Sequence, residues 1–366
     1  MNRGSDGRVA LVHDWLVGWG GSERVLQVLA EMFPDAPIYT AVWAPDQKIR
    51  AVFGHREVRP TFLHEIPGAA RHYRKLLPLM PAAFRRLDLS RFDLVVSSSH
   101  AFSKAACRGP GARHVCYCHS PPRYLWDLYG TYNPGWRGLV GSPVARWLRR
   151  TDLGAARGVD HFVANSRTVA ERIRRHYGRE ARVVHPPVEV DPFVAASKTG
   201  EPEEWFLTGG RMVRYKRMDV LVRAAALAGF RLKVFGDGPE RRALEAIAGP
   251  QVEFLGSVGD GELADLMARC RAFLFAAEED FGILPVEAQA AGRPVVAWGR
   301  GGVTETVIQD ETGILVDEST PEAFARGATA AGRRDWDRAR LQTHARRFGP
   351  DRFLEGMNHI LDEAGR

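Results

Sequence analysis

Short apolar runs alternate with helical patterns along the whole chain, and this alternation restricts the fold more than any other feature. In the first half the runs cover residues 8–15, 38–43, 93–99, 114–119, 161–166 and 182–188. In the second half they cover 205–210, 231–236, 252–256, 272–277, 294–298 and 313–316. Strands that alternate with helices favour a parallel sheet covered by helices on both faces. The pattern therefore predicts the α/β class.

Prolines and a polar run divide the chain into two halves of this kind. Residues 185–192 contain three prolines, and residues 197–204 form a polar run. We therefore predict a Rossmann-like domain over 1–188, a linker over 189–204 and a second Rossmann-like domain over 205–347. We expect the two domains to face each other across a cleft.

The bulk composition is that of a soluble globular protein. Of the 366 residues 45% are hydrophobic and 26% are charged, which is ordinary for such proteins. No run of eighteen apolar residues occurs, so we expect no transmembrane helix, and the polar start does not resemble a signal peptide. Four cysteines are too few for a disulfide scaffold. A cytoplasmic protein is the resulting expectation.

The charge is distributed unevenly between the halves. Residues 1–186 hold 28 Lys and Arg against 15 Asp and Glu, whereas residues 187–366 hold 23 against 29, so the net charges are +13 and −6. A basic half indicates an anionic partner, and nucleic acid, an anionic membrane surface and a phosphorylated acceptor all fit. A basic surface that is merely solvated is the alternative.

One basic segment has the pattern of an interfacial helix. Within residues 71–87 apolar side chains recur at helical spacing among five Lys and Arg, and Pro78 predicts a bend between two short helices. Such a segment suits peripheral contact with the inner face of the plasma membrane. A surface helix that packs on its own core has the same pattern, so both interpretations stay open.

A glycine-rich turn follows the first apolar run. Gly20, Gly21 and Ser22 stand between that run and a helical pattern, and paired glycines let a ligand approach the backbone closely. The spacing does not fit the dinucleotide fingerprint G-x-G-x-x-G. Ser22 is also a candidate N-cap of the helix.

Two cysteines and two histidines lie close together at residues 114–119. Cys116 and Cys118 are two apart on a strand, and no second pair completes a tetrahedral zinc site, so we expect no metal. We expect both thiols to be small core residues, while the strand carries His119 to its C-terminal end. Ligands bind at that end in open α/β sheets. A hydrogen-bonded core histidine is the alternative for His119.

The stretch at 278–288 combines a strand end, a glycine and a helix start. Backbone N–H groups after Gly282 would favour a phosphate, and the carboxylates of Glu279 and Glu287 would accept hydrogen bonds from hydroxyl groups on either side. This combination suits a nucleotide sugar. The alternative is a helix whose first acids only complement its dipole.

Four stretches of the chain resemble motifs of the retaining glycosyltransferases of family 4, which have the GT-B fold. Residues 279–287 match E-x-F-G-x4-E, residues 210–216 match G-R-x4-K, and residues 236–240 match G-x-G-P-E. Residues 119–127 resemble the H-[ST]-P-x-R-Y-x-W-D run of bacterial mannosyltransferase-like enzymes that assemble surface polysaccharide. The resemblance covers nearly the whole chain and implies that residues 348–366 form a helix that packs back on the first domain.

The resemblance also implies site residues. It gives catalytic roles to His119 at the sugar, Arg211 and Lys216 at the diphosphate, and Glu279 at the sugar hydroxyls. The donor-binding residues would be Gly20, Gly21, Gly210, Gly236, Gly238, Phe281, Gly282, Ile283, Leu284 and Glu287. No metal or other cofactor is expected, since the cations and amides would stabilise the leaving diphosphate.

The activity so implied is retaining transfer of a hexose from a nucleotide-sugar donor to a saccharide acceptor. The run at 119–127 favours GDP-mannose, with a UDP-sugar as the alternative, and the basic half would suit a polyprenyl-diphosphate-linked acceptor. A basic nucleic-acid-binding protein is the rival from another class. We expect no nucleic acid, because no aromatic residues are interleaved with the basic clusters as a reading surface requires.

Overall fold

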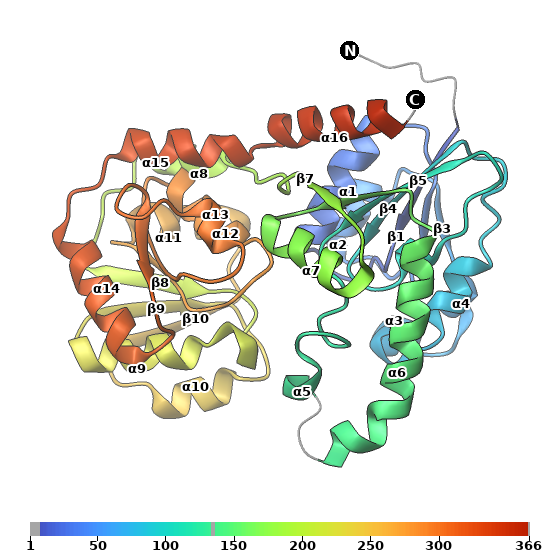
Figure 1. Ribbon diagram of the computed structural model, residues 1–366. Coiled ribbons are helices and arrows are strands. Elements are labelled where there is room, and N and C mark those ends of the chain that lie inside the picture. The colour runs from blue at the N-terminus through green and yellow to red at the C-terminus, as the bar shows by residue number, and fades with distance from the viewer. Residues whose placement is uncertain (1–7, 133–135, 365–366) are drawn as a thin grey trace. The chain divides into compact units, whose positions relative to one another are not determined.

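The computed structural model describes residues 8–132 and 136–364 and divides into two compact units (Figure 1). The first unit comprises Met1–Pro186 and Phe353–Arg366, and the second comprises Pro187–Arg352. Each unit contains one parallel sheet, as predicted.

The first unit is built on a seven-stranded sheet in the order β3-β2-β1-β4-β5-β6-β7. The strands are β1 (Val9–His13), β2 (Ile38–Thr40), β3 (Val58–Pro60), β4 (Leu94–Ser99), β5 (Arg113–Cys118), β6 (His161–Ala164) and β7 (Ala181–Val183). The α-helices are α1 (Gly21–Met32), α2 (Gln47–Phe53), α3 (Ala69–His72), α4 (Met80–Arg85), α5 (Tyr129–Tyr132), α6 (Trp136–Arg157), α7 (Arg167–Tyr177) and α16 (Pro350–Ala364). The 3₁₀ turns are η1 (Phe62–Glu65), η2 (Tyr73–Leu76) and η3 (Ser103–Ala105).

The second unit has a six-stranded sheet in the order β10-β9-β8-β11-β12-β13. The strands are β8 (Trp205–Gly209), β9 (Arg231–Phe235), β10 (Val252–Gly256), β11 (Phe273–Phe275), β12 (Val295–Trp298) and β13 (Gly313–Val316). The helices are α8 (Asp191–Ala196), α9 (Met218–Ala228), α10 (Arg241–Ile247), α11 (Asp260–Arg269), α12 (Ile283–Ala290), α13 (Val303–Thr306), α14 (Pro321–Arg333) and α15 (Arg338–Ala345), with the 3₁₀ turns η4 (Arg214–Lys216) and η5 (Arg346–Phe348).

Apolar cores lie on both faces of each sheet, as is typical of parallel sheets. Each strand contributes to both cores, because successive side chains of a strand point to opposite faces. In β8, Leu207 belongs to one apolar core and Phe206 to the other, and in β11 the same division separates Phe273 from Leu274. The near-continuous apolar runs in the sequence reflect this double burial. All twelve predicted strands are present, whereas the edge strand β3 was missed because it is three residues long and ends in Pro60.

The expected linker at 189–204 differs from the structure. These residues belong to the second unit, and α8 packs against α11 and α12 with Phe193 in the core. Val188 donates a backbone hydrogen bond to the carbonyl of Phe348 at 2.9 Å. The proline run marks the division between the units, but apolar side chains hold the following segment to the second unit. The C-terminal part of α16 lies in the first unit, where Phe353 contacts the ring of Tyr117.

Both sheets reverse their strand order at one point, and the candidate residues cluster at these points. In the first unit the reversal falls between β1 and β4, and in the second between β8 and β11. The loops that leave two such strands go to opposite faces, so a crevice forms outside their carboxyl ends. The two reversals therefore place His13, Ser98 and His119 in one unit, and Gly210 and Glu279 in the other, near a ligand-binding edge.

Candidate functional site

In the second unit an ion pair links the loops that follow β8 and β11. Nζ of Lys216 lies 3.1 Å from Oε1 of Glu279, and the side chains are 14% and 22% exposed. A Cβ placed on Gly210 would lie 3.1 Å from the same Nζ and 3.5 Å from Cδ1 of Leu284. Four residues predicted separately from the sequence, Gly210, Lys216, Glu279 and Leu284, thus meet in one place.

The glycines of the next loop are required by close packing between loops. Gly236 has φ of +100°, and a Cβ there would lie 2.1 Å from the carbonyl oxygen of Gly210. Its N–H donates to the carbonyl of Gly256 at 2.6 Å. A Cβ on Gly238 would lie 2.3 Å from the carbonyl oxygen of Met212. Loop packing alone accounts for these glycines, and their contact with a nucleotide stays a prediction.

Helix α12 begins as the anion-site prediction requires. Gly282 is its N-cap, with φ of +91° and without a side-chain cap, and Ile283 is its first residue. Glu287 is the fifth residue of α12 and 1% exposed, and Glu279 precedes the helix. The helix dipole acts within the first turn, so dipole complementation does not explain either acid.

Two further predicted residues of this unit lie outside the cluster around Lys216. The ring of Phe281 is in the core and meets Phe348 edge to face, with 5.6 Å between the ring centroids. Arg211 is exposed and has no hydrogen bond or ion pair with another described residue. The only structural support for its predicted role at the diphosphate is that Arg211 directly follows Gly210.

In the first unit a buried chain of hydrogen bonds leads to His119. Oγ of Ser98 lies 2.8 Å from Nε2 of His119 and 3.1 Å from Nδ1 of His13. On its other side, Nε2 of His13 lies 3.3 Å from Oε1 of Glu23. Desolvation and the neighbouring His100 and His13 hold the pKa of His119 well below its usual value, so its ring is neutral at neutral pH.

The glycine turn adjoins this chain at Glu23. A Cβ on Gly20 would lie 3.1 Å from Oε2 of Glu23, and Gly21 is the first residue of α1. The N-cap of α1 is Gly20, so the interpretation of Ser22 as the cap was wrong. The hydroxyl of Ser22 donates to Oε2 of Glu23 at 2.9 Å instead.

Asp14 orders the loop after β4. Its carboxylate accepts hydrogen bonds from the backbone N–H groups of His100, Ala101, Phe102 and Ser103, at 2.7 to 2.9 Å. Burial raises the pKa of Asp14, but His100, His13 and these hydrogen bonds outweigh it, so the pKa lies below its usual value. The loop is thereby held beside His119.

The sequence analysis missed His13, Asp14, Glu23, Ser98 and His100. A recognisable pattern was present, because His13-Asp14 and Ser98-Ser99-His100 are polar residues at the carboxyl ends of two apolar runs. Cys116 and Cys118 are buried in the core, as predicted. Among the described residues no group of three or more His, Cys, Asp and Glu is arranged to hold a metal ion.

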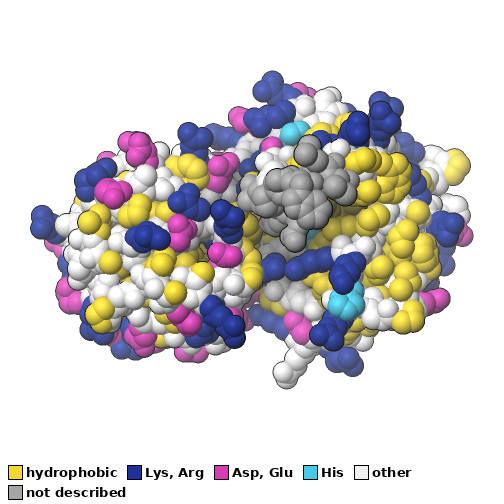
Figure 2. All heavy atoms as spheres, turned by 90° about the horizontal axis from the view of Figure 1, so that it is seen from below, with side chains coloured by type: hydrophobic (Ala, Val, Ile, Leu, Met, Phe, Trp, Pro, Cys, Tyr) yellow, Lys and Arg dark blue, Asp and Glu magenta, His cyan; other side chains and the backbone are white. Residues whose placement is uncertain are grey.

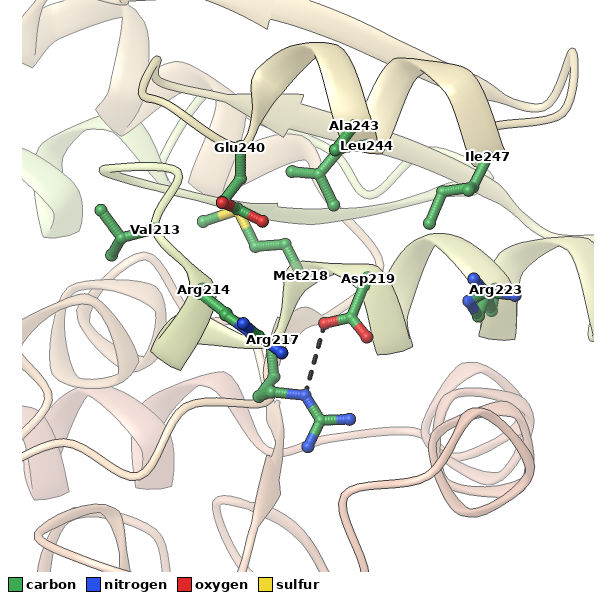
Figure 3. Close-up of a pocket in the computed structure, with 10 residues that line it drawn as sticks. All are labelled: Val213, Arg214, Arg217, Met218, Asp219, Arg223, Glu240, Ala243, Leu244 and Ile247. Atoms are coloured by element: carbon green, nitrogen blue, oxygen red, sulfur yellow. Dashed lines mark hydrogen bonds and ion pairs between the residues drawn. The ribbon is translucent and has the colours of Figure 1, made fainter. Parts of the chain in front are cut away.

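A cavity of about 560 Å³ lies elsewhere in the second unit (Figure 3). Figure 3 shows its lining by α9, α10 and the preceding loop, with Arg217 paired to Asp219 at 3.3 Å. None of the predicted site residues lines it. Cavity size therefore does not locate the candidate site, which rests on the side chains at the strand reversals.

Comparison with known proteins finds glycosyltransferases over both halves of the chain. Residues 19–192 match the family model described as Glycosyltransferase Family 4, and residues 203–331 match the model described as Glycosyl transferases group 1. The D-inositol 3-phosphate glycosyltransferase of Streptomyces avermitilis is 32% identical over 222 residues, which are 52% of this chain and 47% of that protein. The chain thus spans about half the length of the curated relatives it matches first.

Solved structures with low sequence identity share the fold. HepE of Anabaena in complex with UDP and glucose has a TM-score of 0.69 at 18% identity, covering 97% of this chain and 99% of that one. A glycosyltransferase from Rickettsia africae has a TM-score of 0.64 at 17% identity and covers 99% of both chains. These names do not include a mannosyltransferase. The chain has the two-domain GT-B fold of these glycosyltransferases, and its halves are similar in sequence to family 4 and group 1.

Proposed function

We propose that this protein is a retaining glycosyltransferase that moves a hexose from a nucleotide sugar to an acceptor. The contact between Lys216 and Glu279 carries the proposal. The pair lies at the edge where α/β sheets bind ligands. There the Lys216 cation suits the diphosphate of a nucleotide sugar, and the Glu279 carboxylate suits the hydroxyls of its sugar. The glycosyltransferase matches over both halves support the same activity.

In this proposal the second unit binds the donor. Lys216, Arg211 and the N–H groups at the start of α12 bind the diphosphate and stabilise the charge that develops on it as the glycosidic bond breaks. Glu279 accepts hydrogen bonds from hydroxyls of the transferred sugar, and Glu287 from those of the ribose. His119 of the first unit contacts the sugar.

We propose retention by a front-face course, in which the leaving phosphate accepts the proton of the acceptor hydroxyl. The proposal needs no metal or other cofactor, because the protein cations and amides carry the stabilising charge. It assigns no covalent nucleophile to the chain.

Two observations support different donors. The run at 119–127 resembles mannosyltransferase-like enzymes and supports GDP-mannose. The neighbour HepE, solved with UDP-glucose, supports a uridine donor. Thermal-shift screening of the purified protein against GDP, UDP and ADP, each with its sugars, separates them. A shift with one nucleotide sugar, lost in Lys216→Ala but kept in the exposed control Lys198→Ala, supports the proposal; no shift with any of them contradicts it.

The acceptor is proposed to be a saccharide, either polyprenyl-diphosphate-linked or phosphorylated and soluble. The +13 half suits either anion. The curated relatives are named for D-inositol 3-phosphate, which supports a phosphorylated acceptor. Transfer assays with each acceptor type distinguish the two acceptors. Binding of random DNA that is tight and strongly salt-dependent, in a protein that does not bind nucleotide sugars, would instead favour the nucleic-acid alternative.

The basic segment at 71–87 turns most of its apolar side chains toward the protein, and Leu79 is the exposed exception among its leucines. Met80 and Phe84 are in the core of the first unit, and Tyr73, Leu76 and Leu77 pack against it. The helical elements break at 77–79, next to Pro78, as predicted. This packing supports the surface-helix alternative for these side chains, and membrane contact by the segment stays a prediction.

Other apolar side chains of the first unit remain exposed. Val144 and Trp147 of α6 are 52% and 50% exposed, and Arg146 and Arg150 of the same helix are also exposed. Figure 2 shows hydrophobic side chains gathered on this unit with Lys and Arg among them. Among the described residues we find no helix with the length and apolar character that crossing a bilayer requires.

We propose that this surface of α6 contacts an anionic membrane, at the cytoplasmic face where a lipid-linked acceptor would lie. Cationic and aromatic side chains together suit a lipid interface. Flotation with phosphatidylglycerol vesicles is expected for the protein and reduced for Trp147→Ser, while Leu227→Ser, an exposed residue of the second unit, leaves it unchanged. Equal flotation of all three contradicts the surface.

A further inference from the structure

The loop between β12 and α13 lies against the backbone of the segment that carries Glu279. The N–H of Gly302 donates a hydrogen bond to the carbonyl oxygen of Glu279 at 2.9 Å. Gly302 is also the N-cap of α13, and the loop before it contains Gly299 and Gly301. A glycine-rich turn therefore adjoins the residue whose carboxylate pairs with Lys216.

Gly302 is required in this loop by space alone. Its φ of −65° is one that any residue adopts. A Cβ on Gly302 would overlap two backbone atoms, the Cα of Phe281 and the carbonyl oxygen of Asp280. Backbone atoms cannot turn aside as the end of a flexible side chain can, so one of the two segments would have to move. The neighbouring segment at 279–281 thus explains this glycine, and its own conformation does not.

Gly301 approaches the same segment. It has φ of +74°, in the left-handed region that favours glycine. A Cβ on Gly301 would lie 2.5 Å from the carbonyl oxygen of Glu279 and 3.3 Å from the backbone nitrogen of the same residue. Gly299 differs, since a Cβ there would make only ordinary contacts, the nearest at 3.5 Å from the carbonyl oxygen of Val316. Two of the three glycines are therefore fitted to the backbone at 279–281.

Both sides of this contact are anchored in the core of the second unit. Val303 directly follows the glycines and is buried. On the other side, the ring of Phe281 is buried and packs against the ring of Phe348. Glu279 lies at the other end of its segment, and its side chain is 22% exposed. A displacement forced at the glycines therefore falls mainly on Glu279.

We propose that Gly301 and Gly302 are positioning residues that hold Glu279 against Lys216. The N–H of Gly302 fixes the carbonyl of Glu279, and the lack of two Cβ atoms lets the backbone lie where the carboxylate reaches the ammonium at 3.1 Å. Resting on the proposed function, this position lets the carboxylate accept hydrogen bonds from the transferred sugar. Glycine at 302 is then a requirement of transfer and not only of folding.

Crystal structures of the ligand-free protein read the position of Glu279 without turnover. In wild type and in the control Gly299→Ala, Nζ of Lys216 should contact the carboxylate of Glu279. In Gly302→Ala the pair should be broken, with more than about 4 Å between these atoms. A pair that persists in Gly302→Ala, or that is missing from wild type, overturns the inference.

A second variant separates the contact from backbone strain. Asn tolerates positive φ, so Gly301→Asn keeps the backbone conformation but adds a Cβ against the carbonyl oxygen of Glu279. It should break the pair with Lys216, and it supplies the reading if Gly302→Ala does not fold. The matched control is Gly229→Asn, because Gly229 has φ of +71° and no atom within 4 Å of an added Cβ. An intact pair in Gly301→Asn overturns the inference for Gly301.

Nucleotide affinity gives a second reading in solution, by isothermal titration calorimetry with UDP and GDP. In wild type, Glu279→Gln should tighten nucleoside diphosphate binding about fivefold, because it frees the ammonium of Lys216. In the Gly302→Ala background the same substitution should change the affinity by less than about twofold, because the pair is already broken. A glycine needed only for stability would leave the fivefold ratio unchanged. That outcome, or no change in wild type, contradicts the inference.

Activity supplies an independent reading. Gly302→Ala should lower kcat/KM for transfer by roughly tenfold to a hundredfold, as a misplaced group at the sugar does, whereas Gly299→Ala should stay near wild type. A broken pair in Gly302→Ala, in a protein whose wild type transfers no sugar, would count against the proposed function only. An intact pair in Gly302→Ala with normal transfer would count against this inference only.

Discussion

Replacing Glu279 by Gln should separate nucleotide binding from sugar transfer. The substitution keeps the size of the side chain and removes the charge that pairs with Lys216. In the variant the ammonium of Lys216 no longer pairs with a carboxylate, so a bound diphosphate does not have to compete with that carboxylate for it. We therefore expect tighter binding of the free nucleoside diphosphate together with loss of transfer, because an amide replaces the ionised carboxylate that accepts hydrogen bonds from the sugar hydroxyls.

The size of this effect follows from the geometry. Two unit charges 3.1 Å apart attract with about 5 kcal/mol at an effective dielectric constant of about 20. Desolvation and ordering consume most of this, and partly exposed pairs contribute about 1 kcal/mol net. Glu279→Gln should therefore tighten diphosphate binding about fivefold.

Isothermal titration calorimetry with UDP and GDP measures this directly. Glu278→Gln is the matched control, since it removes the same charge one residue away and leaves the pair of Lys216 and Glu279 intact; the nucleotide affinity of this variant should stay within about twofold of wild type. A fall in nucleotide affinity in Glu279→Gln that parallels the loss of transfer would refute the separate roles of Glu279 and Lys216.

Three further variants test the framework of the site. The ammonium of Lys104 is 1% exposed and lies 2.7 Å from the carboxylate of Asp152. Asp152→Ala removes this charged partner, so urea denaturation should show a free energy of unfolding lower by about 3–5 kcal/mol. A decrease below about 1 kcal/mol contradicts the pairing. Gly236→Ala should lower the free energy of unfolding by about 1–3 kcal/mol in the same assay and should weaken nucleotide binding. The control is Gly259→Ala, where no atom lies within 4 Å of an added Cβ, and it should leave nucleotide binding unchanged. Asp14→Asn should lower the free energy of unfolding at neutral pH. Because the pKa of Asp14 is lowered in the folded state, the stability that its ionised carboxylate contributes is lost as the pH falls through that folded pKa. A difference in stability between wild type and variant that does not shrink in acid contradicts this role.

The strands and most of the fold were predictable because both faces of each sheet are buried. Continuous apolar runs such as 272–277 have few alternatives in an α/β chain, and the glycines after β8 and β9 marked the loops at the ligand-binding edge. A side chain that itself caps a helix is recognisable from its residue type, and Ser166, whose hydroxyl accepts from the N–H of Val169 at 3.1 Å, is such a cap. Ser22 failed as a cap because α1 already begins at Gly21, so Ser22 lies within the first turn of the helix and its hydroxyl donates to Glu23 instead.

What could not be predicted depends on contacts between distant strands. Nothing local in the sequence shows that Lys216 meets Glu279, or that Ser98 joins His13 to His119. These pairs arise from the strand order at the two reversals, which the apolar pattern leaves open. The segment at 189–204 was wrongly predicted to be a linker for the same reason. Its α8 packs against α11 and α12, and these contacts between distant segments are not visible in the local composition.

The central claim, retaining transfer of a hexose from a nucleotide sugar, is tested most directly by following the reaction by NMR. Purified protein is incubated with GDP-mannose or UDP-glucose and with D-inositol 3-phosphate or a polyprenyl-diphosphate-linked saccharide, and ³¹P and ¹H spectra are recorded over time. We predict release of nucleoside diphosphate in step with a glycoside whose anomeric configuration equals that of the donor, in wild type and not in Glu279→Gln. An inverted anomer, or donor that stays intact with every acceptor, would contradict the account.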